Sequence, residues 1–326
     1  MIGRRRLLYT GFGVTASALF VPRLLKAFDP DWGFQAPWKQ PVASSNKLSV
    51  GGAVVQVDFG EGEFRLAQSE VLAWVRRAVE AVAGYYGRFP VTAARVLVLP
   101  SSGSGIHNGT TWGNVGGSPA FTRIRVGERT TAEQLHGDWM MTHELVHMGL
   151  PSLPDENHWF EEGTAVYVEP IARVQAGQLL EEQVWGDMMR DMPQGQPDRG
   201  DQGLNGTRSW GRTYWGGAGF CLLADVEIRK RTKNRKGLQD ALRGIVGAGG
   251  NIAEDWEMLP TLKAGDAATG TQVLVEFYER MRDKPVTVDF DGLWKQLGVT
   301  ESNGSISFNV KAPLADIRQA IFAKNA

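Results

Sequence analysis

The segment His143-Glu144-Leu145-Val146-His147 restricts the fold more than any other part of the 326-residue chain. On an α-helix, residues four positions apart lie on one face, so both imidazoles can reach a single metal ion. Neutral imidazole nitrogens suit zinc, and a glutamate beside them is placed to take a proton from water. The segment therefore predicts a helix with two zinc ligands, His143 and His147, and a general base, Glu144. The alternative is an ordinary surface pair of histidines.

The cysteine count limits the kinds of metal site that the chain can build. Cys221 is the only cysteine, which excludes an intramolecular disulfide, a cysteine-based zinc finger and an iron–sulfur cluster. A zinc site must therefore use histidines and carboxylates. The chain has 35 Lys or Arg and 36 Asp or Glu, so a nucleic-acid binder with a strongly basic surface is also excluded. With 42% hydrophobic residues, the composition is that of a globular protein.

The third zinc ligand is expected downstream, because a catalytic zinc has three protein ligands and one open position. Residues 159–167, which read WFEEGTAVY, have helical character and two candidate carboxylates. Glu161 and Glu162 are adjacent, so they point about 100° apart on a helix and only one can face the metal. The alternative for this pair is a solvated helix face.

The order of these segments resembles the gluzincin metallopeptidases, in which a HExxH helix is followed by a helix with the pattern W-x-x-E-G-x-A-x-Y. The resemblance implies that Glu162, immediately before Gly163, is the third zinc ligand. Residues 213–229 resemble the Y-x-K-G stretch and following helix of the glycyl aminopeptidase family, which implies that Tyr214 stabilises an oxyanion. It further implies an α+β, thermolysin-like catalytic domain, zinc-dependent hydrolysis of peptide bonds by a metal-activated water, and a peptide or protein substrate. Beyond zinc, no cofactor is expected.

Three features depart from that family's pattern. Only 14 residues, 148–161, separate His147 from Glu162, which shortens the usual gap. Gly216 stands where the family has a lysine. The Gly-Gly strand that ends in an amine-binding glutamate is missing, since residues 116–119 read GGSP and lack a carboxylate. Exopeptidase and endopeptidase activity therefore both stay open, and no PDZ module is expected. The alternative function is a catalytically inactive, metallopeptidase-like secreted binding or scaffold protein.

Hydrophobic periodicity predicts a single domain over 28–326, with an α/β part at 28–130 and a helical part at 131–326. Residues 28–47 are interpreted as a lead-in and 193–217 as a long loop. The expected strands are 53–59, 95–100, 120–126 and 306–310. The expected helices are 68–86, 132–148, 158–172, 217–231, 238–246, 269–281 and 314–322.

Residues 1–27 are interpreted as a targeting segment. Arginines at 4–6 precede an apolar run over 7–21, which is short for a membrane span and suits an export signal. The run resembles a twin-arginine signal. Because no clean cleavage site follows, a signal and an uncleaved membrane anchor both stay open, and a basic amphipathic helix is the alternative. The expected location is periplasmic or extracellular, and membrane association through this segment stays open with the anchor alternative; the oligomeric state is not predicted.

Other polar residues near the motifs receive ordinary interpretations. His158 lies four positions before Glu162 and is expected to support the site rather than bind the metal. His136 lies on the expected 132–148 helix and is taken as a partly buried histidine. Arg212 is expected on a solvated surface, and Asp225 with Arg229 as an ion pair within a helix.

Overall fold

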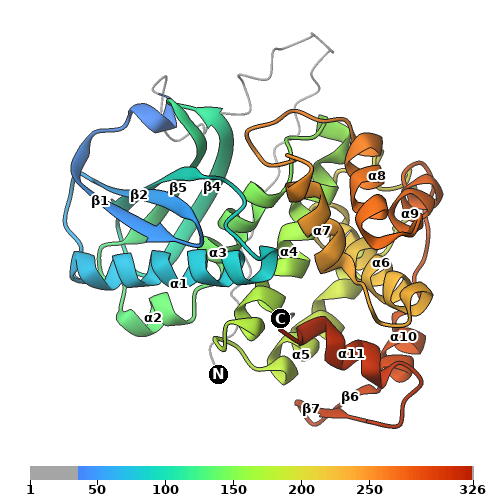
Figure 1. Cartoon of the computed structure of the whole chain (residues 1–326). Coiled ribbons are helices and arrows are strands. Elements are labelled where there is room, and N and C mark those ends of the chain that lie inside the picture. Colours follow the sequence, from blue (N-terminus) through green and yellow to red (C-terminus); the bar gives the residue numbers. More distant parts are fainter. Residues whose placement is uncertain (1–35, 325–326) are drawn as a thin grey trace. The chain divides into compact units, whose positions relative to one another are not determined.

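The computed structural model describes residues 36–324, of which 38–324 belong to one compact unit. The unit has a β-sheet half and a helical half, joined by helices that run between them (Figure 1). The targeting segment predicted at 1–27 lies outside the described residues. Within the described part of the chain, none of the helices has the length and hydropathy needed to cross a bilayer.

The sheet half holds five strands in the order β1-β2-β3-β5-β4. β1 (Val42–Val50) and β2 (Ala53–Gly60) form an antiparallel hairpin. β3 (Ala93–Ser101) runs parallel to both β2 and β5 (Ser118–Gly127). β4 (Ile106–Val115) is antiparallel to β5, so the strand that precedes β5 in sequence becomes the free edge of the sheet.

The predicted strands at 53–59, 95–100 and 120–126 are confirmed, but two strands of the sheet were missed. Residues 42–47 were placed in the lead-in, yet they belong to β1, where the polar Ser44 and Asn46 are half-buried on the same face as Leu48. Residues 106–115 were not predicted to form a strand, yet they form β4. Nearly every residue of β4 is half-buried, so the strand has no apolar alternation to detect.

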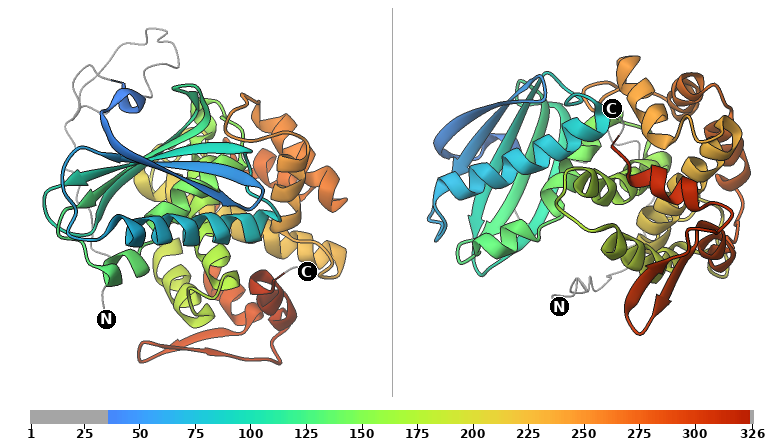
Figure 2. Two further views of the ribbon diagram at one scale, coloured as in Figure 1. Left: turned by 60° about the vertical axis from the view of Figure 1, so that its left-hand side comes forward. Right: turned by 60° about the horizontal axis from the view of Figure 1, so that its bottom comes forward.

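Helix α1 (Gln68–Tyr86) confirms the prediction over 68–86 and lies along the sheet (Figure 2). Its buried side is lined by valines three or four positions apart, such as Val71, Val75, Val79 and Val82. Gly87 ends the helix in the left-handed region, at φ 81°, which a residue without a Cβ adopts at no steric cost.

The expected helix over 132–148 is wrong as a single element. It divides into α2 (Ala132–His136), α3 (Met140–Val146) and a 3-10 turn that begins at His147. Asp138 causes the break, because its carboxylate accepts hydrogen bonds from the backbone N–H groups of Met140 and Met141 at 3.0 Å each. An aspartate in this position starts a new helix rather than continuing the old one.

The rest of the chain is mainly helical. Its helices are α4 (His158–Gln175), α5 (Glu181–Asp191), α6 (Gly217–Thr232), α7 (Leu238–Gly247), α8 (Met258–Thr269), α9 (Val273–Met281), α10 (Phe290–Leu297) and α11 (Ala315–Phe322). A hairpin of β6 (Val299–Ser302) and β7 (Ser305–Phe308) precedes α11.

Most helix predictions in this half are confirmed, with three corrections. The helix expected over 269–281 starts later, because Gly270 ends α8 at φ 69° and α9 begins at Val273. Helices α5, α8 and α10 were not predicted. The loop expected over 193–217 ends early, since residues 212–216 form a π-helical turn that leads into α6.

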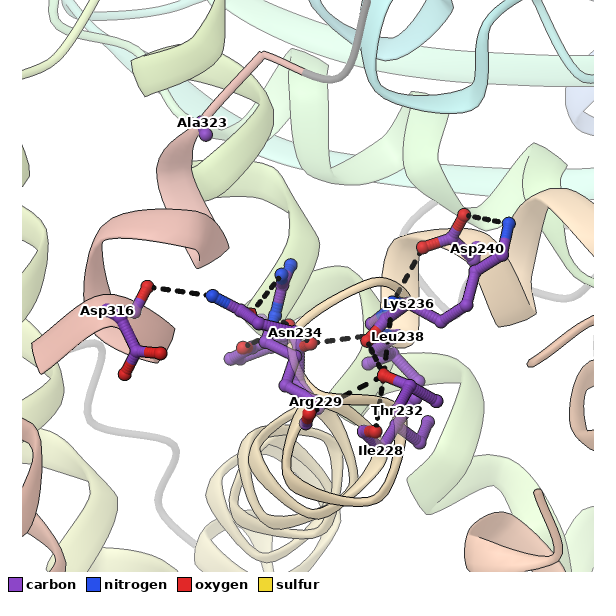
Figure 3. Close-up of polar contacts among 12 residues, drawn as sticks. Ile228, Arg229, Thr232, Asn234, Lys236, Leu238, Asp240, Asp316 and Ala323 are labelled. Atoms are coloured by element: carbon purple, nitrogen blue, oxygen red, sulfur yellow. Dashed lines mark hydrogen bonds and ion pairs between the residues drawn. The ribbon is translucent and has the colours of Figure 1, made fainter. Parts of the chain in front are cut away.

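Helices α4, α6 and α7 meet at a group of buried polar residues, called here the Asp225 cluster: Tyr167, Asp225, Arg229 and the backbone N–H of Leu238. The predicted ion pair between Asp225 and Arg229 is confirmed, with N–O 2.8 Å, and both side chains are buried. Figure 3 shows the end of this cluster, where Arg229 and Asn234 close the turn between α6 and α7.

Candidate active site

Helix α3 carries the HExxH segment through the interior of the unit. Every residue from Met141 to Val146 is buried. The helix is fixed to α1 because the indole Nε1 of Trp74 donates to Asp138 Oδ2 at 3.1 Å, and Asp138 also accepts from the start of α3. A helix of this length is unstable alone, so tertiary contacts set its position.

The structure brings together the three residues that the sequence nominates as metal ligands. His143 Nε2 lies 3.2 Å from Glu162 Oε2, and His147 Nε2 lies 3.6 Å from the same oxygen. One ligand atom from each residue lies within 4.8 Å of the others, and His143 and Glu162 are buried. Among residues 36–324 this is the one group of three such side chains whose atoms converge in this way. Two imidazoles and a carboxylate form a donor set that fits zinc.

The electrostatics of these three residues favour the forms that bind a metal. Burial lowers the pKa of His147 to about 4, so its imidazole is neutral at pH 7. Burial acts to raise the pKa of Glu162, but the two histidines outweigh it and lower the pKa to about 2. Burial also opposes charge on His143, but its hydrogen bond to Glu162 raises its pKa overall. Metal binding requires neutral imidazole and ionised carboxylate, which is the state of His147 and Glu162.

Glu144, the predicted general base, lies buried beside these three residues. Burial raises the pKa of its carboxyl group to about 7. A carboxyl group with a pKa near the working pH can both take and return a proton, which suits acid–base catalysis. Its Oε2 accepts a hydrogen bond from Thr111 Oγ1 at 2.8 Å.

Helix α4 turns Glu162, and not Glu161, toward the histidines. Glu161 Oε1 accepts a hydrogen bond from the backbone N–H of Leu153 at 3.0 Å, which closes the short loop between α3 and α4. His158 contacts both acids: its Nδ1 lies 3.0 Å from Glu161 Oε2 and its Nε2 lies 3.3 Å from Glu162 Oε1. The two oxygens of Glu162 are therefore divided, one facing His143 and one facing His158.

Gly163 explains why a glycine follows Glu162. A Cβ at this position would lie 2.2 Å from the carbonyl carbon of Gly217, and one at Gly217 would lie 2.1 Å from the carbonyl oxygen of Trp159. Helices α4 and α6 therefore approach backbone to backbone. This contact brings the segment that precedes α6, with Tyr214, next to the group of His143, His147 and Glu162, called here the ligand cluster.

Tyr214 lies in the π-helical turn Arg212–Gly216, half-buried between two rings. Its ring is nearly parallel to that of His143, at 6.5 Å and 14°, and to that of Trp210, at 5.7 Å and 23°. Single π-helical turns occur often at functional sites. The expectation for Arg212 is wrong: its guanidinium is buried, pairs with Asp201 at 2.8 Å and donates to the backbone of the same loop, which holds this turn in place.

Strand β4 forms the wall beside Glu144, and sequence reasoning missed it. Thr111 and Gly109 lie on one face of the strand. Thr111 donates a hydrogen bond to Glu144 Oε2, and Gly109, which has no side chain, leaves room for the Glu144 side chain. The strand has no Asp or Glu, and the pair at Gly116-Gly117 is the turn between β4 and β5, with φ 60° and 79°. A polar strand without periodicity carries no signal from which these contacts could be predicted.

The remaining histidines stay outside the cluster. His136 ends α2 and is exposed, so the prediction of a partly buried histidine is wrong; the break at Asp138 separates α2 from α3. His107 lies on β4, where its Nδ1 is 3.1 Å from Ser101 Oγ.

Comparisons with known proteins give a likeness in fold and none in sequence. No protein-family model and no curated protein matches the chain. The solved structure of an aminopeptidase N family protein from Idiomarina loihiensis matches with a TM-score of 0.50 and 12% identity, over 85% of this chain and 48% of that one. An M1 zinc metallopeptidase from Deinococcus radiodurans matches with a TM-score of 0.48 and 14% identity, over 76% of this chain and 53% of that one.

The fold is similar to that of the aminopeptidase N family protein from Idiomarina loihiensis. The sheet half and the helical half both fall within that likeness, which covers most of this chain. The chain spans about half the length of the solved structures that it matches.

Proposed function

We propose that the chain is a zinc metallopeptidase of gluzincin type with a thermolysin-like catalytic domain. The observation that carries the proposal is the convergence of His143, His147 and Glu162, with the carboxyl group of Glu144 buried beside them. A structural zinc site closes all its positions with protein ligands, whereas three ligands and an adjacent base suit catalysis. The likeness in fold to an aminopeptidase N family protein supports the same function.

Each residue has a distinct role in this proposal. His143, His147 and Glu162 hold the zinc ion, which when bound supplies a Lewis acid that lowers the pKa of water to about 7. Glu144 takes a proton from the attacking water and returns it to the leaving amine. Tyr214 donates a hydrogen bond to the oxyanion that develops at the scissile carbonyl, as preorganised donors do in other hydrolases.

The substrate in this proposal is a peptide or a protein. Strand β4, beside Glu144, offers no carboxylate to bind a substrate's free amino group, so exopeptidase and endopeptidase activity both stay open. Export to the periplasm or outside the cell, with residues 1–27 as signal or anchor, also belongs to the proposal. Cell fractionation of the full chain, with N-terminal sequencing of the product, tests the location; recovery in the cytosol with an intact N-terminus contradicts it.

The decisive experiment combines metal analysis with digestion of a broad peptide library by the full-length chain. We expect one zinc per chain, cleavage that a chelator stops and zinc restores, and a Glu144→Gln variant that keeps zinc but loses about 10²- to 10⁴-fold in turnover. The exposed Glu156→Gln is the matched control and should cleave normally. A chain that binds zinc and cleaves nothing contradicts the proposal and favours the inactive binding or scaffold protein.

A further inference from the structure

We propose that Thr111 of edge strand β4 is a positioning residue for the general base: its hydroxyl holds one oxygen of Glu144 so that the other oxygen serves the reaction. The proposal rests on the peptidase function proposed above and deepens it. It adds a residue that neither the HExxH segment nor the fold likeness indicates. Three contacts carry it: one from Thr111, one from Thr122 on the next strand, and one at Gly109.

The first contact joins the strand to the side chain of the base. Thr111 Oγ1 lies 2.8 Å from Glu144 Oε2 and 3.1 Å from the backbone carbonyl oxygen of the same residue. Glu144 is only 7% exposed, so bulk water does not compete for this carboxylate. A hydrogen bond to an ionised carboxylate is about twice as strong as one between neutral groups.

The second contact decides which way the hydroxyl protons point. Thr111 and Thr122 are directly opposite each other in the β4–β5 ladder, and their hydroxyl oxygens lie 2.9 Å apart. Thr122 is fully buried, so its proton needs an acceptor within the protein, and Thr111 Oγ1 is placed to accept it. A hydroxyl has only one proton to donate, and of the two Glu144 acceptors the carboxylate Oε2, at 2.8 Å, is nearer to Thr111 Oγ1 than the carbonyl oxygen, at 3.1 Å.

The third contact bounds the carboxylate on the side of its other oxygen. Gly109 lies two residues before Thr111 and therefore on the same face of the strand. A Cβ at position 109 would lie 2.6 Å from Glu144 Cγ and 2.9 Å from Oε1. The Glu144 side chain occupies its present place only because this residue has no side chain.

Together these contacts give the two oxygens of Glu144 different tasks. Oε2 accepts the Thr111 proton throughout, and Oε1 takes the proton from the attacking water and passes it to the leaving amine. Thr111 keeps its own proton during the cycle, so it positions the base without exchanging protons with it. A base must lie within hydrogen-bond reach of the proton that it removes, and small displacements are costly in rate.

The test uses Thr111→Val, which removes the hydroxyl and keeps the shape, in the full-length zinc-loaded chain. We expect kcat to fall about 10- to 100-fold, the loss that follows removal of one hydrogen bond to a charged group, with KM and zinc content unchanged. Thr111→Ser should restore kcat to within about 3-fold of the wild type, because it returns the hydroxyl. Thr110→Val is the matched control, since its side chain points to the other face of the strand.

A second readout does not depend on activity. Crystal structures of zinc-loaded Thr111→Val and Thr110→Val should show the Glu144 carboxylate turned away from β4 in the first variant only. Gly109→Ala adds a variant that tests the same base position, because the flexible Glu144 side chain can yield to the new methyl group. We expect it to keep zinc and to lose kcat.

The outcomes distinguish a failure of the positioning role of Thr111 from a failure of the proposed peptidase function. A wild-type chain that cleaves no peptide contradicts the peptidase function itself. An active wild type with Thr111→Val at full kcat, or with an unmoved Glu144, overturns the positioning role. A loss that Thr111→Ser does not restore, or that comes with lost zinc, also overturns it, because the hydroxyl would then serve the fold. If Thr111→Val does not fold, normal kcat in Gly109→Ala overturns the proposal.

Discussion

Two buried polar clusters lie along helix α4, and they differ in how donors and acceptors are balanced. In the Asp225 cluster, the carboxylate of Asp225 accepts from the hydroxyl of Tyr167 at 2.9 Å, from Arg229 Nε at 2.8 Å and from the backbone N–H of Leu238 at 2.9 Å. Each charge has its counterpart within the chain. Such a group fastens three helices to one another and has no need of a ligand.

The cluster of His143, His147 and Glu162 is balanced only in part, because the contacts of His143 and His158 with Glu162 leave the buried imidazole of His147 neutral beside the carboxylate. With His147 neutral and Glu162 ionised, imidazole nitrogens and a carboxylate oxygen face one another around one point, and a cation there satisfies all three. The comparison teaches that burial and charge alone do not identify a functional site. The cluster in which three possible metal-ligand atoms converge is the one expected to bind a cation.

The largest expected effect is on the ligand cluster. Glu162→Gln removes the only anionic ligand, so zinc affinity should fall by more than about 100-fold, beyond what loss of an outer partner costs. Peptide cleavage should be lost with it, while the metal-free chain should lose only about 1 kcal/mol of unfolding free energy. Zinc titration against a competing chelator measures the affinity, and urea unfolding of the metal-free chain measures the unfolding free energy. If the metal-free Glu162→Gln chain does not fold, the ligand cluster also stabilises the fold, and the stated difference between the two clusters is wrong.

The Asp225 cluster should show the opposite behaviour. Asp225→Asn leaves Arg229 as a buried, unpaired cation, which typically costs about 3–5 kcal/mol of unfolding free energy. Zinc content per folded chain should not change. Urea unfolding followed by circular dichroism measures the loss, and Asp316→Asn, at an exposed site on α11, is the control. Equal stability of the two variants would contradict the role given to the cluster.

Alkaline pH should lower the stability of the folded chain through buried groups near the Asp225 cluster. Burial raises the pKa of the Cys221 thiol from 9.0 to about 12, and burial together with Asp225 raises the pKa of Tyr85 and Tyr167. Above pH 9 the unfolded chain loses these protons while the folded chain keeps them. Stability present below pH 9 should therefore fall as the pH rises toward 12, by up to about 1.4 kcal/mol per pH unit and group. The midpoints of urea unfolding at pH 8 and pH 10.5 measure this loss of stability, and equal midpoints would contradict the prediction.

A smaller effect is expected at the outer oxygen of Glu162. His158→Ala removes the ring beside Oε1, and partners that orient a ligand typically contribute about 10- to 100-fold to metal affinity. Competition with a chelator measures the change. The exposed His136→Ala is the matched control, and the same affinity in both variants would show that His158 does not orient the ligand.

The smallest effect is expected on the surface beside the Asp225 cluster. Lys236 and Asp240 form an exposed pair at 2.9 Å, one turn apart at the start of α7 (Figure 3). Lys236→Ala should cost only about 0.3–0.5 kcal/mol, and less in high salt. If Lys236→Ala lost as much unfolding free energy as Asp225→Asn, burial would not explain the difference between the exposed pair and the buried cluster.

The secondary structure was predictable where a periodic apolar face reports burial. Helix α1 matches its predicted bounds at 68–86, because its valines repeat at helical spacing. Strands β1 and β4 were missed because they lie at the two edges of the sheet, where no continuous apolar face is required. The continuous helix over 132–148 was wrong because a local hydrogen bond, from the backbone N–H of Met140 to the Asp138 carboxylate, outweighs periodicity.

What the sequence alone determined is local: the spacing that places two histidines and a glutamate on one short helix, and the second helix with Glu162 before a glycine. Those relations depend on a few consecutive residues and on helix geometry. Only the tertiary structure decided that α4 and α6 touch at Gly163, that Tyr214 lies beside His143, and that Thr111 reaches Glu144. These contacts join segments far apart in the chain, and packing, which no local pattern records, selects them.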